Sequence, residues 1–267
     1  MSENISTNNI DLKSPYNLSE DQVASFRFDG FIKLKDVLSS ETLEYYKEEI
    51  TSMVFKLNNE TRQLEDRSTY EKAFLQIENM FLHSKIVKEF VSSTRFGQIA
   101  TELMGTRGVR MYHDQALYKE AGGGHTPWHV DQVYWPFSTD NCITAWVPLV
   151  PISMKMGPLA FAPGSHNIKE YRDMIISDES EAKIQQMMDK IGVAYSVSTF
   201  DLGDVSFHYG WTFHRADENK SGIAREVMTI IYMDIDMKIT RKDDLWCPDT
   251  QPGEIPNNYK NFVIYEK

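Results

Sequence analysis

The stretch Gly-Gly-Gly-His-Thr-Pro-Trp-His-Val-Asp-Gln, residues 122–132, is the most informative part of this 267-residue sequence. Its three glycines predict a turn, and the residues that follow predict an extended segment. Side chains two positions apart in an extended segment point to the same side, so His129 and Asp131 can bind one metal ion together. His125 lies four residues before His129, roughly 13 Å along an extended chain, so we do not expect it to bind the same ion.

A third ligand is expected from residues 203–217, a later segment that contains His208 and His214. Alone, a His-x-Asp pair is a weak signal, because such pairs occur by chance in solvated loops. Two imidazoles and one carboxylate on one face of an octahedron leave three positions open, as in iron(II) oxygenases. Arg225 follows His214 by eleven positions, and in a returning hairpin its guanidinium would face the same space and offer a planar fork for a carboxylate.

The sequence around these residues predicts a β-rich fold. From Gly108 onward, short apolar or alternating runs are separated by Gly, Pro, Asn and Asp. The runs cover residues 109–119, 142–150, 157–162, 194–200, 204–214 and 225–239. This pattern is typical of an antiparallel sandwich or roll. Residues 167–191 are charged and partly helical, and we interpret them as an insertion or lid over one end of the roll.

The N-terminal half predicts helices that buttress the roll. Residues 1–16 are polar and predict a mobile tail, which leaves residues 17–267 as a single domain. Ser19 and Gln22 have the spacing of a capping box and predict a short helix that ends at Gly30, followed by a strand at 31–34. Further helices are predicted at 84–104. A helix over 39–57 would place on one face Leu43, Tyr46, Ile50, Val54 and Phe55.

Composition restricts the possible partners. The formal net charge is -11 and the pI is about 5.1, so a nucleic acid or an anionic membrane surface would repel the protein at long range. No apolar run approaches the roughly 20 residues needed to cross a bilayer, and the start of the chain lacks the pattern of a signal peptide. The two cysteines form no CxxC pair. We therefore expect a cytoplasmic protein; the sequence does not indicate its oligomeric state.

Taken together, these stretches resemble the phytanoyl-CoA dioxygenase family of iron(II)/2-oxoglutarate oxygenases. The resemblance implies a mainly β fold with flanking helices, the double-stranded β-helix or cupin-like jelly roll. The matching stretches follow the family order over about 100 residues. They are Trp128 to Gln132 with Tyr134 to Pro136, Ala145 to Leu149, Gly157 to Leu159, Pro163 to His166, Gly203-Asp204 leading to His214, and Arg225.

By this resemblance His129, Asp131 and His214 are the iron ligands, and Arg225 binds the C5 carboxylate of 2-oxoglutarate beside Trp146. Related halogenases replace the carboxylate ligand by a small residue, so Asp131 favours hydroxylation or another carbon oxidation. Relatives often have Ser two positions after the distal histidine, where this chain has Ala216. A second contact to the cosubstrate carboxylate is then expected from one of three residues, Gln115, Tyr118 or Lys119.

Several residues beside the ligands are candidates for contacting substrate, although each of them can equally pack the roll. They are Trp128, Gln132, Tyr134, Trp135 and Trp211.

The implied activity is the oxidation of a small molecule with iron(II), 2-oxoglutarate and dioxygen, which releases succinate and carbon dioxide. The alternatives are a cupin-like metal-binding protein without 2-oxoglutarate-dependent oxidation, and a non-catalytic binding module. Arg225 argues against the first, and the complete set of three ligands argues against the second. Nothing in the sequence selects a substrate.

Overall fold

The structure, a computed structural model, describes residues 10–267; the remainder of the predicted tail lies outside the described residues. Two antiparallel sheets form its centre. The major sheet has, in spatial order, β1 (Phe31–Leu34), β8 (Val205–Tyr209), β5 (Cys142–Pro148), β10 (Arg225–Asp234), β3 (Gly108–Lys119) and β11 (Val263–Glu266), with β2 (Leu75–Glu78) also paired to β3. The minor sheet has β4 (Thr126–His129), β9 (His214–Ala216), β6 (Leu159–Phe161) and β7 (Ser196–Val197). This arrangement confirms the predicted cupin-like double-stranded β-helix.

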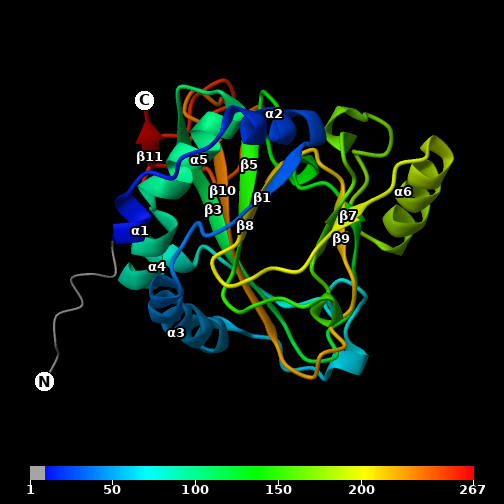
Figure 1. Ribbon diagram of the computed structural model, residues 1–267. Helices are drawn as coiled ribbons and strands as arrows, with labels where there is room; N and C mark the ends of the chain where they lie inside the picture. Colours follow the sequence, from blue (N-terminus) through cyan, green and yellow to red (C-terminus); the bar gives the residue numbers. More distant parts are fainter. Residues whose placement is uncertain (1–9) are drawn as a thin grey trace, which may run out of the picture.

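Helices cover the outer face of the major sheet. They are α1 (Ile10–Lys13), α2 (Glu20–Asp29), α3 (Ser40–Leu57), α4 (Lys85–Val91) and α5 (Thr94–Met104). Figure 1 shows α1, α3, α4 and α5 on one side of this sheet, with α6 (Asp178–Ile191) on the other side, beyond β7 and β9. Short 3-10 helices occur at Leu64–Asp66, Met80–Leu82, Gln132–Tyr134, Met154–Met156 and Ser165–Asn167. None of the helices within residues 10–267 is long and apolar enough to span a membrane.

The predicted helix starts and stops are largely confirmed. Ser19 and Gln22 form the capping box of α2, and Gly30 ends this helix with a φ of 85°. A residue with a positive φ at the end of a helix is usually glycine, because glycine has no Cβ to clash with the backbone. On α3, four of the five predicted residues are buried, but Phe55 is 57% exposed. Phe55 follows Val54 directly, so its side chain points to the edge of the apolar stripe. There its ring lies 5.1 Å from the ring of Tyr118, centroid to centroid.

Two sequence predictions are wrong. Residues 10–16 are not a mobile tail, because α1 packs on α5, with Leu12 buried and its carbonyl accepting a hydrogen bond from Ser93 Oγ at 3.0 Å. The run 204–214 is not one strand: β8 belongs to the major sheet and β9 to the minor sheet. Gly210 lies between them, so the chain crosses from one sheet to the other at this point. The predictions also missed two strands, β2 and β11, whereas β4 lies within the predicted extended segment.

Candidate metal centre

His129, Asp131 and His214 meet between the two sheets, where their ligand atoms all lie within 4.8 Å of one another. His129 ends β4 and stands directly opposite His214, the first residue of β9. This pairing explains why two residues 85 positions apart converge. Asp131 Oδ1 lies 3.7 Å from His129 Nε2 and 3.5 Å from His214 Nε2. A metal–ligand bond of about 2.1 Å implies donor separations of about 3 to 3.5 Å, so a small inward shift fits these three donors to one ion.

The local conformation at Asp131 differs from the prediction. Strand β4 ends at His129, and Asp131 has helical backbone angles and precedes the 3-10 helix Gln132–Tyr134. The two ligands therefore do not lie on one continuous extended segment. The turn of the chain brings the carboxylate back over the histidine, so the pair still faces one centre.

Both histidines present their Nε2 atoms to this centre. The Nδ1 of His129 lies 2.8 Å from the Pro127 carbonyl, and the Nδ1 of His214 lies 2.9 Å from the Thr212 carbonyl. A carbonyl only accepts, so each Nδ1 is the protonated nitrogen and each Nε2 keeps a lone pair for a metal. Burial lowers the pKa of both imidazoles, which keeps them neutral near pH 7.

Asp131 is held as a carboxylate by its neighbours. Burial favours a higher pKa, but His214 and His208 together hold the pKa of Asp131 below its ordinary value. Thr144 Oγ1 donates to Oδ2 at 3.0 Å, and His208 Nε2 lies 3.1 Å from the same oxygen. His208 is thus close to the centre but contacts the other oxygen of Asp131 and is not one of the three grouped ligands.

A cavity of about 330 Å³ opens beside the triad, and Arg225 reaches into it. Arg225 is 1% exposed, donates a hydrogen bond to the Gly157 carbonyl, and lies 5.4 Å from the centre of the Trp146 ring. Burial lowers its pKa to about 9. The predicted hairpin is wrong, because β9 and β10 lie in different sheets. Arg225 faces the triad across the space between the sheets.

Several buried side-chain atoms of residues that line this cavity have no hydrogen-bond partner. Among them are Thr126 Oγ1, Trp146 Nε1 and Arg225 Nε. Leaving buried donors unsatisfied costs free energy, so such a group of donors indicates a place for an acceptor. Thr126 stands directly opposite Ala216 in the sheet. Its hydroxyl therefore lies beside the position where relatives often carry Ser; the sequence prediction missed it because cross-strand register is not visible in one sequence.

Of the three residues predicted to contact the cosubstrate carboxylate, only Gln115 lines the cavity. Tyr118 lies on the opposite face of β3 and packs against Phe55 and the helix-side core. The Lys119 amine is fully buried and donates to the carbonyls of Gly124 at 2.6 Å and Asp217 at 2.9 Å. Lys119 therefore joins two loops and is not a lining residue.

Of the predicted substrate contacts, Tyr134 and Trp135 line the cavity. Trp128 points away from it and donates from Nε1 to Gln185 Oε1 of α6 at 2.9 Å. Gln132 is buried and donates to the Thr139 carbonyl at 2.7 Å, and Trp211 donates to Asp140 at 2.8 Å. These three residues secure the surroundings of the site and do not form its wall.

Two residues of the segment predicted to be a lid lie at the cavity. Ile175 and Ile176 line it, and the Ile176 backbone N–H donates to the Tyr134 hydroxyl at 2.9 Å. Sequence reasoning missed several further lining residues that approach from outside the matched motifs. Among them are Tyr70, Gln76, Glu78 and Trp246.

A double-stranded β-helix with two imidazoles, one carboxylate and a buried arginine in one cavity defines the class of iron(II)- and 2-oxoglutarate-dependent oxygenases. The family model of phytanoyl-CoA dioxygenase (PhyH) matches residues 26–227. The chain therefore belongs to the phytanoyl-CoA dioxygenase family, and it is an enzyme of this oxygenase class.

Individual relatives agree with this membership. A probable alpha-ketoglutarate-dependent hypophosphite dioxygenase of Stutzerimonas stutzeri is 26% identical over 213 residues, which are 76% of this chain and 74% of that protein. Among solved structures, the non-heme alpha ketoglutarate dependent carbocyclase SnoK from nogalamycin biosynthesis has a TM-score of 0.81 at 22% identity, over 94% of this chain and 100% of that chain. EctD from S. alaskensis has a TM-score of 0.69 at 16% identity, over 92% of this chain and 87% of that chain. The two structural likenesses establish the fold.

Proposed function

We propose that His129, Asp131 and His214 bind one iron(II) and that the enzyme oxidises a small-molecule substrate at this site. The observation that supports this assignment most is the direction of the two imidazoles. Both Nδ1 atoms are engaged by backbone carbonyls, so both Nε2 atoms are free to bind a metal beside Asp131 Oδ1. Bound iron(II) would supply the activation of dioxygen, with 2-oxoglutarate as the electron source.

We propose that Arg225 binds the C5 carboxylate of 2-oxoglutarate. Its guanidinium is buried in the same cavity as the triad and forms no ion pair with a carboxylate among residues 10–267. A buried cation without a counter-ion is costly, and the distal carboxylate of the cosubstrate would supply the missing charge. Thr126 Oγ1 and Trp146 Nε1 add two unpartnered donors. Thr126 then takes the place of the Ser that relatives often have at position 216.

The chain's own residues hold and shield the reactants. Thr144 and His208 fix Oδ2 of Asp131, which leaves Oδ1 directed at the metal position. Ile175 and Ile176 of the lid cover the cavity and restrict water, which protects an oxidising site from side reactions. In the overall reaction, one oxygen atom of dioxygen enters succinate and the other enters the oxidised substrate or leaves as water.

The alternative of a metal site without 2-oxoglutarate chemistry gives Arg225 no role. A structural metal needs no permanently charged, buried fork at the far side of the cavity. We keep the prediction of a cytoplasmic enzyme that acts on a small molecule, and we propose no nucleic-acid or membrane partner.

Anaerobic iron(II) titration of the metal-free protein tests the ligand assignment. The wild type should bind one iron(II) per chain, and His129→Ala, Asp131→Ala and His214→Ala should each lose most of this binding. His125→Ala is the matched control and should bind normally, because His125 is not in the cluster. Full occupancy in His214→Ala would contradict the assignment and give the ligand role to His208.

A further inference from the structure

The cavity has a second polar end, which the proposed iron chemistry does not use. Gln76 and Glu78 face it from β2, because side chains two positions apart in a strand share a face. The alternate residues Leu75 and Ile77 pack toward the helix-side core. Glu78 stands directly opposite Gln115 of β3.

This polar end is remote from the proposed cosubstrate position. One row of cross-strand partners crosses four neighbouring strands of the major sheet in the order Trp146, Thr229, Gln115 and Glu78. Three strand spacings of about 4.8 Å place Glu78 about 14 Å from the strand that carries Trp146. A substrate between these two ends would have one end near the iron position and the other at Glu78.

Hydrogen bonds orient Glu78 without neutralising it. Gln76 Nε2 donates to Glu78 Oε1 at 3.3 Å and to Gln115 Oε1 at 2.6 Å, while the Tyr70 hydroxyl donates to Gln76 Oε1 at 3.0 Å. Burial raises the pKa of Glu78; a hydrogen bond with the Trp246 side chain opposes this shift, and no cationic neighbour among the described residues does so. The carboxylate is therefore half-buried, held in place and without a counter-ion.

Aromatic rings form much of the wall of this cavity. Tyr70, Tyr134, Trp135 and Trp246 all line it. His113 stacks on Trp246 at 4.9 Å, but burial lowers the pKa of His113 to about 4, so this imidazole is neutral near pH 7 and gives Glu78 no counter-charge. Faces of tyrosine and tryptophan rings attract cations through their quadrupoles.

The balance of charges in the cavity also favours a cationic ligand at this end. Apart from histidines, the described lining residues include one basic side chain, Arg225, and two carboxylic acids, Asp131 and Glu78. Iron(II) and the 2-oxoglutarate dianion cancel one another, and so do Arg225 and Asp131. An ionised Glu78 adds one uncompensated negative charge at the substrate end, and a buried charge of this kind is costly unless a cation joins it.

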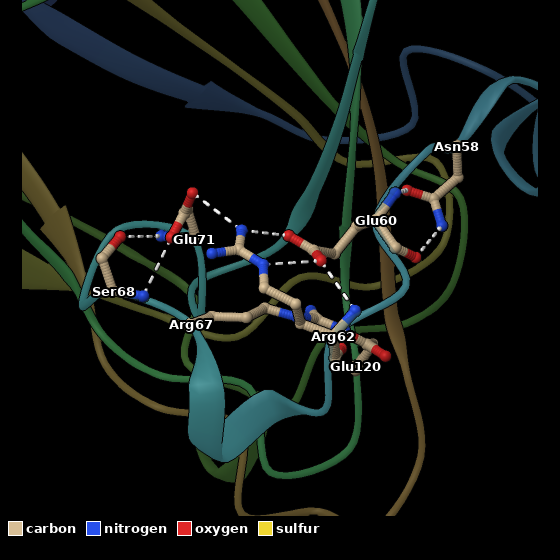
Figure 2. Close-up of polar contacts among 7 residues, drawn as sticks. All are labelled: Asn58, Glu60, Arg62, Arg67, Ser68, Glu71 and Glu120. Atoms are coloured by element: carbon tan, nitrogen blue, oxygen red, sulfur yellow. Dashed lines mark hydrogen bonds and ion pairs between the residues drawn. The ribbon is translucent and has the colours of Figure 1, made fainter.

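A second cavity of about 540 Å³ adjoins the first and shares Glu78 with it. Glu60 and Glu71 also line it, and no described lysine or arginine does. Figure 2 shows Arg62 between these two carboxylates, with hydrogen bonds of 2.9 Å to each. One positive charge is therefore shared by two negative charges. This approach to the site is negatively charged, and its field would attract a positively charged molecule.

We propose that the substrate is a small organic ammonium ion whose charge is bound by Glu78 and the surrounding aromatic rings. It enters through the acidic second cavity and places its uncharged end toward the iron position. This inference rests on the proposed oxygenase function and specifies the chemical class of its substrate.

Calorimetric titration of the anaerobic full-length protein, loaded with iron(II) and 2-oxoglutarate, tests this proposal. The probes are two pairs with similar shape and different charge: choline with 3,3-dimethyl-1-butanol, and n-butylammonium with 1-butanol. In at least one pair the cation should bind on the order of tenfold more tightly than its neutral partner. Glu78→Gln should abolish this preference. Glu44→Gln, the same change on the exposed face of α3, should retain it.

Equal binding of the charged and uncharged members by the wild type would overturn the proposal, whether or not Glu78→Gln folds. A preference that survives in folded Glu78→Gln would overturn the role of Glu78. The visible absorption band that forms when 2-oxoglutarate binds iron(II) is recorded first on the same sample. Its absence would mean that the oxygenase assignment fails, whereas its presence without a cation preference would reject the ammonium substrate alone.

Discussion

Replacing Arg225 should separate cosubstrate binding from iron binding. Its guanidinium is 1% exposed and makes one side-chain hydrogen bond, to the Gly157 carbonyl, so most of its donors are available to a ligand. Arg225→Met keeps much of the side-chain volume and removes the charge. The C5 carboxylate would then be buried without its partner, at a cost of about 2 to 5 kcal/mol. At about 1.4 kcal/mol per decade, the 2-oxoglutarate requirement should rise by roughly 30-fold or more.

The assay is an anaerobic 2-oxoglutarate titration of the iron(II)-loaded protein, followed by its visible absorption band. Arg225→Lys is the matched variant and should recover only part of the affinity, because an ammonium keeps the charge but loses the planar fork. Iron affinity in the absence of 2-oxoglutarate should barely change, since Arg225 is not in the ligand cluster. Wild-type 2-oxoglutarate affinity in folded Arg225→Met would refute the assignment of the C5 carboxylate to this residue.

Two further predictions concern buried polar groups. Thr126→Val should weaken 2-oxoglutarate binding by about tenfold, because a hydrogen bond to a charged group is lost. Adding Ala216→Ser on the neighbouring strand should restore part of this affinity. Unchanged affinity in Thr126→Val would exclude the hydroxyl from the cosubstrate site. Burial raises the pKa of Asp114 to about 8, so between about pH 4 and 8 the folded protein binds more protons than the unfolded chain. The free energy of unfolding should therefore fall as pH rises through this window. The contribution of Asp114 to this fall is at most about 1.4 kcal/mol per pH unit. Asp114→Asn should flatten this dependence in thermal or denaturant unfolding, and an identical pH profile in both proteins would contradict the buried, protonated state.

The metal ligands could be predicted from sequence because their chemistry is local. His129 and Asp131 are two positions apart, and His214 lies in the one later segment that offered a second histidine at the right place in the family order. The exact backbone was not predictable, since the strand ends between the first two ligands. The three ligand side chains still meet at one point, because this depends on which side chains are near one another and not on an unbroken strand.

The wall of the cavity was harder to predict, because it depends on strand parity and register. Gln115 and Tyr118 are three positions apart in one strand, so they point to opposite faces and cannot both face the cosubstrate. Lys119 has the parity of Gln115, but carbonyls from two distant loops occupy its amine. Glu78 lies on a short strand that the apolar pattern did not indicate. Thr126 can be recognised as a site residue only from its pairing with Ala216 across the sheet.

The central claim is that this chain uses iron(II) and dioxygen to decarboxylate 2-oxoglutarate. Incubation of stoichiometric iron-loaded protein with 2-oxoglutarate under ¹⁸O₂, followed by mass spectrometry of the succinate, measures this reaction even without the natural substrate. We expect succinate that carries one ¹⁸O atom, and no such product with Asp131→Ala. Intact 2-oxoglutarate in the presence of fully iron-loaded wild-type protein, or succinate without the label, would contradict it.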